Sequence, residues 1–511
     1  MNRSKFVWLA VLIGAATCVA LAFNNGGVVS GAADADMLWP ASFMWDLTTR
    51  ADGWRGHNLP RVPSLLPDLL VWVPLAFATG AVRWTVFLYG ILQITAFVAV
   101  GGWIAARIAG RERYVGGAAV LAVLAVVVAV GLTNLGAGGM LRAQLLPVVH
   151  AGPMVLALLI AASTAGRLAA GRSVWPIAVA GMGVFLSDRL LLVDSVLPLT
   201  IATVALVVGG RIRLSQMIGA FLWLAGGIGL GWIGFTLLLR AGVSVDPVPE
   251  VFAGVLIDGL RQFVIGMPAL IAEAPIVIAV VGVAALASVV LGLRLLRTTP
   301  RSPEGLFLLL FVVLSAAGSI AFTAFFFVDS GSTRYLASLW LCVIVVLGAG
   351  LASMPNATRA AGPLAAATLA ALLIVFAVQD HGRVAMLRWK YDVAECVRKL
   401  RGPLGLHAGL AEYWVARPAE VALHWSTQID QITEDGRAYL WSNDARWFRH
   451  SLADPSRPPD YDFVVLRRLD PARIAAHYGK PDSVVPCFNT EIWIYRDRAA
   501  LYAKVAEGLP P

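Results

Sequence analysis

Long runs of apolar residues, separated by short polar connectors, dominate the first 379 positions of the chain. A helix that spans a bilayer needs about 20 predominantly apolar residues. The runs that reach or approach this length are 6–23, 84–108, 114–134, 147–166, 174–187, 191–209, 214–238, 274–296, 305–328, 335–354 and 362–379. The pattern therefore predicts an all-α polytopic membrane bundle of about eleven transmembrane helices.

The connectors between these runs differ in charge. Basic residues gather in 107–113, 166–172, 211–213 and 294–301, and at Arg359. Cytoplasmic loops carry an excess of Lys and Arg, so we place these connectors in the cytoplasm. Eleven alternating spans then predict a cytoplasmic N-terminus and a C-terminal part outside, in the periplasm of a bacterial inner membrane.

The run 65–81 is also apolar, but counting it as a span would put the basic connector 107–113 outside. It contains Pro67, Asp68 and Pro74. We therefore expect an interfacial helix on the outer face, while the alternative of a twelfth span stays open.

The composition agrees with a membrane protein. Hydrophobic residues make up 59% of the chain, charged residues 14%, and the mean hydropathy is +0.76. Soluble domains are typically about 45–50% apolar and about 25% charged. The net charge of +9 comes largely from the basic connectors, so it does not indicate a nucleic-acid partner.

From Asp380 onward the sequence becomes charged and rich in Trp and Tyr. Alternating patterns predict strands at 461–469 and 491–497, and helices are expected at 391–400 and 470–479. The chain thus divides into a transmembrane domain, 1–379, which includes an outer loop, 24–83, and a C-terminal α/β domain, 380–511, outside the membrane.

Four cysteines are present, and two of them, Cys396 and Cys487, lie in the C-terminal domain. If this domain is periplasmic, it lies in an oxidising compartment where paired thiols persist as disulfides. We therefore expect these two residues to be bonded. Cys18 and Cys342 lie inside apolar runs, where packing is their expected role.

An acidic and Trp-rich stretch, 31–82, directly follows the first apolar run. Its five aspartates are Asp34, Asp36, Asp46, Asp52 and Asp68. Interleaved Trp residues favour a position at the membrane–water interface. The stretch is either an active site built at the bilayer surface or an ordinary connector whose acids are solvated.

Several cationic residues break the charge bias by lying at outer ends of predicted spans: Arg83, His150, Arg189 and Arg334. Ionisable residues at membrane depth are costly and usually face a cavity or a partner. As a set, they indicate an anion site. The alternative is structural: Asp188 pairs with Arg189, or the arginines reach toward lipid head groups.

Three motifs together resemble the GT-C superfamily of polytopic glycosyltransferases, such as protein O-mannosyltransferases and lipid A aminoarabinose transferases. D-A-D at Asp34–Asp36 matches the acidic motif that follows the first span in that family. The segment 63–83 is similar to the family's Pro-rich interfacial helix, and RYLASLW at 334–340 to its Arg-Tyr entry into a late span. The family pattern often has Asp-Glu where this chain has D-A-D, so the resemblance leaves open which acid is catalytic.

The resemblance implies transfer of a sugar from a polyprenyl-phosphate carrier to a saccharide, lipid or protein acceptor on the outer face. Asp36 is the leading general base, with Asp34 as its rival. Arg83, His150, Arg189 and Arg334 are expected to bind the carrier phosphate. Asp188, Asp68 and Arg61 are further candidates for substrate binding. No cofactor is implied, no nucleic acid is expected, and the need for a divalent metal stays open.

Other functions remain possible from the residues alone. A transporter or flippase for lipid-linked sugars would use the same arginines without bond formation, although no internal repeat is visible. A polysaccharide polymerase or ligase would also use outer arginines, without needing an acid directly after the first span. A non-catalytic assembly partner is the fourth alternative.

Overall fold

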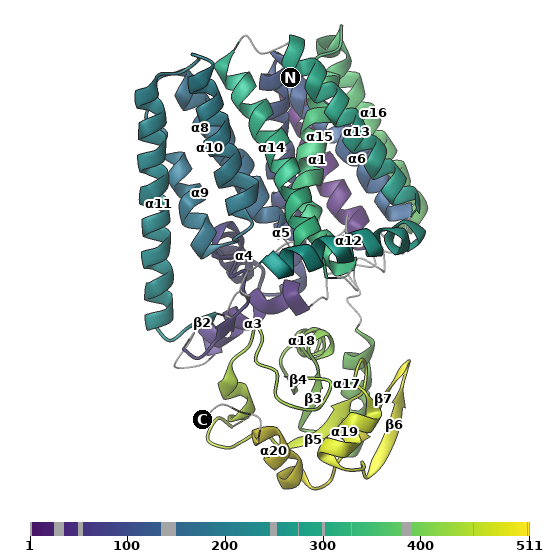
Figure 1. Cartoon of the computed structure of the whole chain (residues 1–511). Helices are drawn as coiled ribbons and strands as arrows, with labels where there is room; N and C mark the ends of the chain where they lie inside the picture. The colour runs from purple at the N-terminus through teal and green to yellow at the C-terminus, as the bar shows by residue number, and fades with distance from the viewer. Residues whose placement is uncertain are drawn as a thin grey trace.

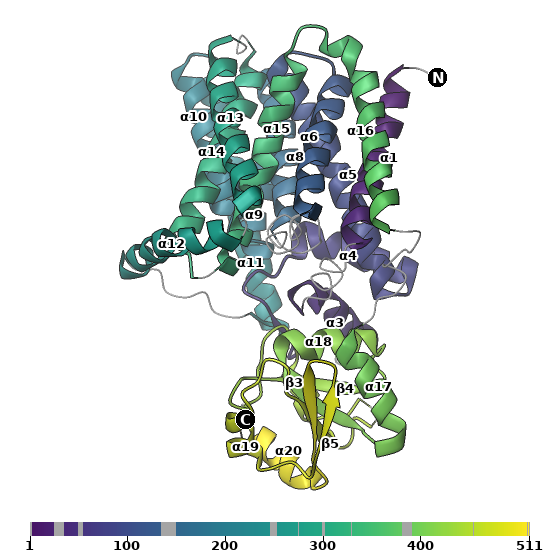
Figure 2. The ribbon, with the colours of Figure 1, turned by 90° about the vertical axis from the view of Figure 1, so that its right-hand side faces the viewer.

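The computed structural model describes residues 3–24, 35–49, 55–133, 150–245, 253–273, 275–298, 302–328, 330–380, 391–452, 454–507 and 509. A helical bundle occupies one end of the molecule and a smaller α/β domain the other (Figure 1). The first helix starts at the end of the bundle that lies farthest from the C-terminal domain (Figures 1 and 2).

Helices occur at each of the eleven predicted apolar runs within the described residues. They are α1 (Arg3–Asn24), α5 (Val82–Ala109), α6 (Arg113–Thr133), α8 (Ala151–Ala169), α9 (Pro176–Leu186), α10 (Leu197–Val208, after the π-helical turn η2, Leu192–Val196), α11 (Leu214–Arg240), α13 (Pro275–Thr298), α14 (Pro303–Phe325), α15 (Ala337–Ala352, after the 3₁₀ turn η3, Ser330–Leu336) and α16 (Ala357–Asp380). By length and composition, six helices in the described part of the chain can cross a membrane.

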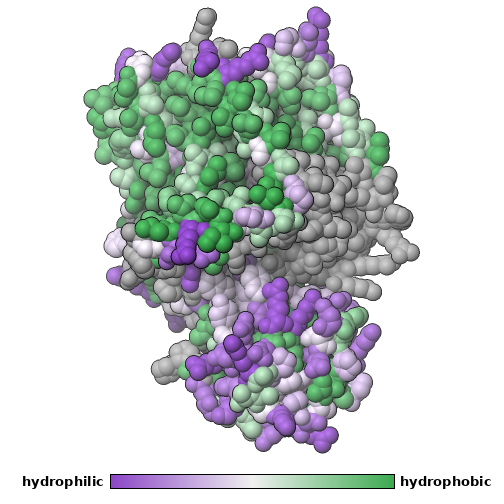
Figure 3. Space-filling model, turned by 45° about the vertical axis from the view of Figure 1, so that its right-hand side comes forward, coloured by the Kyte–Doolittle hydropathy of each residue, from purple (hydrophilic) through white to green (hydrophobic). Residues whose placement is uncertain are grey.

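On the face shown in Figure 3, hydrophobic residues cover much of the bundle, while hydrophilic ones gather at its far end and over the C-terminal domain. At the far end, the Arg107 guanidinium lies 3.5 Å from the Glu304 carboxylate. Two predicted basic connectors, 107–113 and 294–301, begin at the ends of α5 and α13. The polar–apolar–polar banding is the arrangement expected of a chain that crosses a bilayer.

Three helices lie at the end of the bundle next to the C-terminal domain (Figures 1 and 2). They are α3 (Ala35–Thr49), α4 (Leu70–Thr79, after the π-helical turn η1, Leu65–Leu69) and α12 (Ala253–Glu273). α4 ends at Gly80, whose positive φ of 61° stops the helix. The run 65–81 thus contains a short helix at this end, and α12 lies between α11 and α13 in the chain.

Five strands form one sheet within the described residues of the C-terminal domain, in the order β4-β3-β5-β7-β6. The strands are β3 (Ala408–Glu412), β4 (Gln428–Ile432), β5 (Tyr461–Val465), β6 (Ser483–Cys487) and β7 (Thr490–Ile494). β3 pairs in parallel with β4 and β5, whereas β7 is antiparallel to β5 and β6. A two-stranded parallel pair, β1 (Asn58–Leu59) and β2 (Ser244–Val245), lies outside this domain's sheet.

Helices cover both faces of the sheet. They are α17 (Asp392–Leu404), α18 (Tyr413–Ala422), α19 (Pro471–Tyr478) and α20 (Arg498–Ala506), with a 3₁₀ turn η5 (Ala445–Phe448). α17 and α18 contribute to the apolar core on one face, and α19 and α20 to that on the other. α19 begins as predicted, since the Asp470 side chain accepts a hydrogen bond from the Ala472 backbone N–H at 2.8 Å.

The predicted disulfide is confirmed. Cys396 and Cys487 are bonded, with their Cα atoms 6.0 Å apart, and the bond links α17 to the end of β6. Cys18 and Cys342 are buried free thiols, as expected of packing residues.

Candidate functional site

The first turn of α3 presents Asp36 where the bundle meets the C-terminal domain. An acidic side chain is favoured at a helix N-terminus because the unpaired backbone N–H groups carry partial positive charge. The Asp36 side chain is about one-third exposed, so it reaches open space. Asp34, its rival in the D-A-D motif, lies outside the described residues.

Two distant segments contact the Asp36 carboxylate. The Arg334 guanidinium, in η3, lies 3.6 Å from Oδ2. The Tyr413 hydroxyl, at the start of α18, donates a hydrogen bond to Oδ1 at 2.8 Å. The carboxylate therefore joins the first outer loop, a late bundle segment and the C-terminal domain.

A cavity of about 160 Å³ opens beside this carboxylate. Its lining comes from five separate parts of the chain: Asp36, Trp39, Pro60, Arg61, Val62, His150, Arg334, Tyr335 and Trp441. Four of the nine predicted site residues, Asp36, Arg61, His150 and Arg334, thus meet at one cavity. Such a group can hold an anion, because the two arginines and an imidazole supply N–H donors around it.

Buried contacts hold the His150 side chain in place. Its Nδ1 lies 2.5 Å from an Asp188 carboxylate oxygen, and both side chains are largely buried. The other Asp188 oxygen accepts a hydrogen bond from the Leu190 backbone N–H at 2.9 Å. The Tyr335 ring packs against the His150 ring, with centroids 5.2 Å apart. Asp188 is thus a partner of His150, in place of the pairing with Arg189 that the sequence had suggested as an alternative.

Asp68 takes part in buried contacts inside the protein and not in the lining of the cavity. It is almost fully buried and accepts a hydrogen bond from the Tyr89 hydroxyl. Gly152 lies so close that an added Cβ would fall 1.9 Å from the Asp68 carboxylate oxygen. Asp68 therefore depends on a glycine at position 152 and does not line the cavity.

The remaining predicted residues differ in position. Arg61 lines the cavity and lies over the Trp441 ring, 5.4 Å from its centroid. Arg83 is exposed and lies over the Trp84 ring, and Arg189 is exposed; neither lines the cavity. Their roles in phosphate binding stay predictions, and neither residue lies at this cavity.

A second aspartate of α3 anchors the C-terminal domain. Asp46 is fully buried, lies 2.9 Å from His57 Nδ1 and accepts a 2.9 Å hydrogen bond from the Trp447 indole N–H. The Trp45 and Trp425 rings stack beside it at 5.3 Å. These contacts hold the C-terminal domain against α3, which explains why Tyr413 can reach Asp36.

A second chamber, of about 350 Å³, adjoins the first and shares Asp36, Arg334 and Trp441 with it. The rest of its lining comes from the C-terminal domain: Glu412, Tyr413, Trp414, Ile432, Thr433, Glu434 and Tyr439. None of these seven residues was predicted from the sequence as part of a site. The signal that could have found them is the Trp and Tyr content of the part beyond Asp380.

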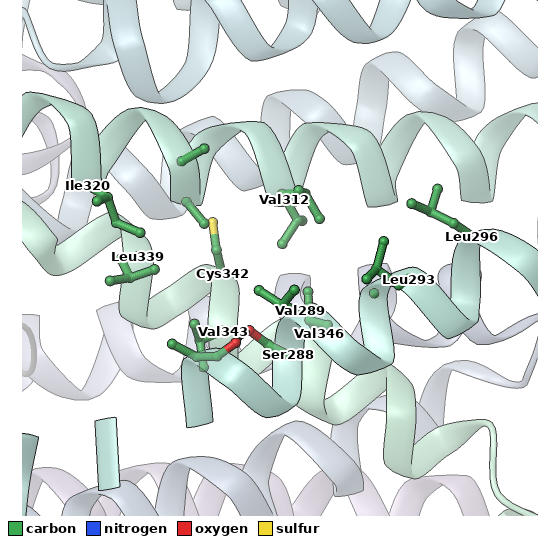
Figure 4. Close-up of a pocket in the computed structure, with 15 residues that line it drawn as sticks. Ser288, Val289, Leu293, Leu296, Val312, Ile320, Leu339, Cys342, Val343 and Val346 are labelled. Carbon is green, nitrogen blue, oxygen red and sulfur yellow. Dashed lines mark hydrogen bonds between the residues drawn. The ribbon is translucent and has the colours of Figure 1, made fainter. Parts of the chain in front are cut away.

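An apolar cavity of about 220 Å³ lies within the bundle, between α13, α14 and α15 (Figure 4). Apart from Ser288 and Cys342, its lining residues are hydrocarbon side chains or glycine. A hydrocarbon chain fits such a lining, whereas a phosphate or a sugar does not. The polar cavities beside Asp36 are therefore the better candidates for a site that binds polar ligands.

No family model matches the chain, and no curated protein is significantly similar to it. In the described part of the chain, no three His, Cys, Asp or Glu side chains are grouped so as to hold a metal ion.

Proposed function

We propose that the protein is an integral membrane glycosyltransferase that transfers a sugar from a polyprenyl-phosphate carrier to an acceptor on the outer face of the membrane. The observation that carries this proposal is the meeting of the Asp36 carboxylate with Arg334, Arg61 and His150 at one cavity. A base and a set of phosphate-binding cations are the groups that the reaction needs.

The chemistry assigns each group a role. The Asp36 carboxylate takes the proton of an acceptor hydroxyl, whose oxygen attacks the anomeric carbon of the sugar. The bond between that carbon and the phosphate oxygen breaks, and polyprenyl phosphate leaves with the electron pair. Arg334 and Arg61 stabilise the charge on the departing phosphate, with His150 held toward it by Asp188.

The position of the site supports a lipid-linked donor. The cavity lies where an apolar bundle ends and a hydrophilic domain begins (Figure 3). A carrier with a long hydrocarbon tail can keep its tail in the bilayer while its phosphate reaches the arginines. The predicted orientation puts this end of the bundle on the periplasmic side.

Purified protein in lipid nanodiscs, given a polyprenyl-phosphate sugar with a radiolabelled sugar, tests the proposal. We expect release of free polyprenyl phosphate, with the label either on an acceptor or in free sugar formed by hydrolysis. A transporter or flippase would leave the sugar–phosphate bond intact, so recovery of only intact carrier would contradict the proposal.

The Arg334→Ala variant tests the role assigned to Arg334. We expect turnover to fall about 100- to 1,000-fold, as when one charge-stabilising donor is removed. Arg401→Ala is the matched control, because Arg401 is exposed near the end of α17, outside both polar cavities. A thermal unfolding scan distinguishes lost chemistry from lost folding: the proposal requires Arg334→Ala to unfold like the wild type.

A further inference from the structure

The second chamber lies at a position where α/β domains commonly bind ligands. Glu412 ends β3, Ile432 ends β4, and the two strands are parallel neighbours joined through α18. Ligands of open α/β sheets bind outside the carboxyl ends of the strands. Here those ends face the bundle and Asp36, because α18 packs beside α3 (Figures 1 and 2).

Partly exposed aromatic rings form one wall of this chamber. The Tyr439 and Trp441 rings are nearly parallel, with an interplanar angle of 3° and centroids 6.4 Å apart. Trp414 lines the same chamber, and all three side chains are only half-buried. The accessible parts of these rings offer flat apolar surface, which attracts the C–H faces of sugar rings.

Hydrogen-bonding groups complete the lining. Glu412 accepts a 2.9 Å hydrogen bond from the Trp414 backbone N–H through one carboxylate oxygen. The side chains of Glu412 and Glu434 both line the chamber. Carboxylates are acceptors and fit the many hydroxyl donors of a neutral sugar. An anionic ligand would instead meet Glu412, Glu434 and Asp36.

We propose that this chamber binds the acceptor and that the acceptor is a neutral saccharide, so that the C-terminal domain determines what is glycosylated. This inference rests on the proposed glycosyltransferase function. The shared residues give it a geometric basis: a saccharide on the Tyr439–Trp441 surface places a hydroxyl toward Asp36, while the carrier phosphate occupies the adjoining cavity. A volume of about 350 Å³ lies within the range of small-molecule sites, roughly 300–1,000 Å³.

Binding without any donor tests the inference separately from catalysis. The full-length protein in nanodiscs is mixed with neutral oligosaccharides of glucose, galactose, mannose or N-acetylglucosamine, and saturation-transfer NMR reports contact. We expect at least one series to bind, and Tyr439→Ala and Trp414→Leu to weaken that binding about tenfold or more. Phe488→Ala is the matched control, since it removes an exposed aromatic ring remote from the chamber.

Kinetics gives the second readout. In Tyr439→Ala, we expect the KM for the saccharide to rise while hydrolysis of the donor by water and the KM for the donor stay unchanged. Equal binding by wild type and Tyr439→Ala, or no binding of any series at millimolar concentration, would overturn the inference. If saccharides bind in the chamber but the donor is never cleaved, the proposed function fails instead.

Discussion

At the scale of single residues, two neighbours in the C-terminal domain, Glu412 and Tyr413, contribute to the candidate site. The Tyr413 hydroxyl bonds to Asp36 across 377 positions of sequence. Glu412, the preceding residue, caps the start of α18 and lines the second chamber. Neighbouring residues of the C-terminal domain thus contact Asp36, the proposed base, and line the space beside it, so we propose Tyr413 as a positioning residue for Asp36.

Tyr413→Phe removes this hydrogen bond while keeping the ring. A bond to a charged group contributes about 1.5–3 kcal/mol, so we expect kcat to fall about tenfold or more. The KM for the donor should not change. Tyr502→Phe is the control, and an unchanged kcat in Tyr413→Phe, or a loss shared with Tyr502→Phe, would contradict a positioning role.

Glu412 links the stability of the domain to pH. Burial raises the pKa of its carboxyl from 4.5 to about 7, opposed by the Trp414 N–H and by the charge of Arg468. The folded state therefore binds the proton more tightly than the unfolded state, and stability from this group declines as pH rises from about 4.5 to about 7.

Glu412→Gln removes this titration and isolates its effect. The variant should be more resistant to thermal unfolding than the wild type at pH 8, with the advantage shrinking toward pH 5. Because the side chain is partly exposed, we expect a difference below about 1 kcal/mol. An advantage that grows as pH falls would show that the sign is wrong.

At the scale of elements, α3 connects the two parts of the molecule. One end places Asp36 at the cavity, and Asp46, further along, binds His57 and the Trp447 indole. The acids of this stretch therefore divide: Asp36 faces open space, while Asp46 and Asp68 are buried in structural contacts. The connector reading, in which the acids are solvated, is wrong for Asp46 and Asp68, whereas the active-site reading of Asp36 stays a prediction.

The disulfide joins two elements of the C-terminal domain, α17 and β6. It closes a loop across a sequence separation of 91 residues. Chain entropy predicts a contribution of about 4 kcal/mol at most, and often less. We expect reductant to lower the unfolding temperature of the C-terminal domain. The same reductant should have no further effect on a Cys396→Ser, Cys487→Ser double variant, and an equal response in both proteins would exclude the bond as the cause.

Some elements could be predicted from the sequence because a long apolar run, or a regular alternation of polar and apolar residues, marks them. The eleven apolar runs became helices, and α17, α19, β5 and β7 lie within or overlap their predicted ranges. β3 and β4 were missed because their residues are buried on both faces of the sheet, so no alternation of polar and apolar residues marks them. β4 even carries the buried polar residues Gln428 and Asp430.

The site was predicted in part for a similar reason. Asp36 follows the first apolar run directly, and Arg334 opens a late one, so position along the chain identified both. Tyr413 and Trp441 could not be found in this way, because the sequence does not show which face of the C-terminal domain meets the outer loop. Arg83 and Arg189 do not line the cavity, because a place near a span end does not decide toward which side an arginine points, and their roles stay predictions.

At the scale of the whole molecule, the start of α1 and the C-terminal domain lie at opposite ends of the bundle (Figures 1 and 2). This agrees with an odd number of crossings, as the alternating charge of the connectors predicts. A phosphatase reporter fused after Pro511 should therefore be active, since it folds only outside the cytoplasm. Activity of a fluorescent reporter that matures only inside would reverse the assigned orientation and move the site to the cytoplasmic face.

The most direct measurement of the central claim compares sugar transfer by wild type, Asp36→Asn and Asp34→Asn with a labelled polyprenyl-phosphate sugar. We predict that Asp36→Asn lowers turnover about 100- to 10,000-fold, because the amide keeps the shape but cannot take the proton. Carrier binding and thermal stability should persist, and the exposed Asp460→Asn should behave as wild type. Loss in Asp34→Asn alone would exchange the roles of the two acids. Full turnover in both variants would contradict the account.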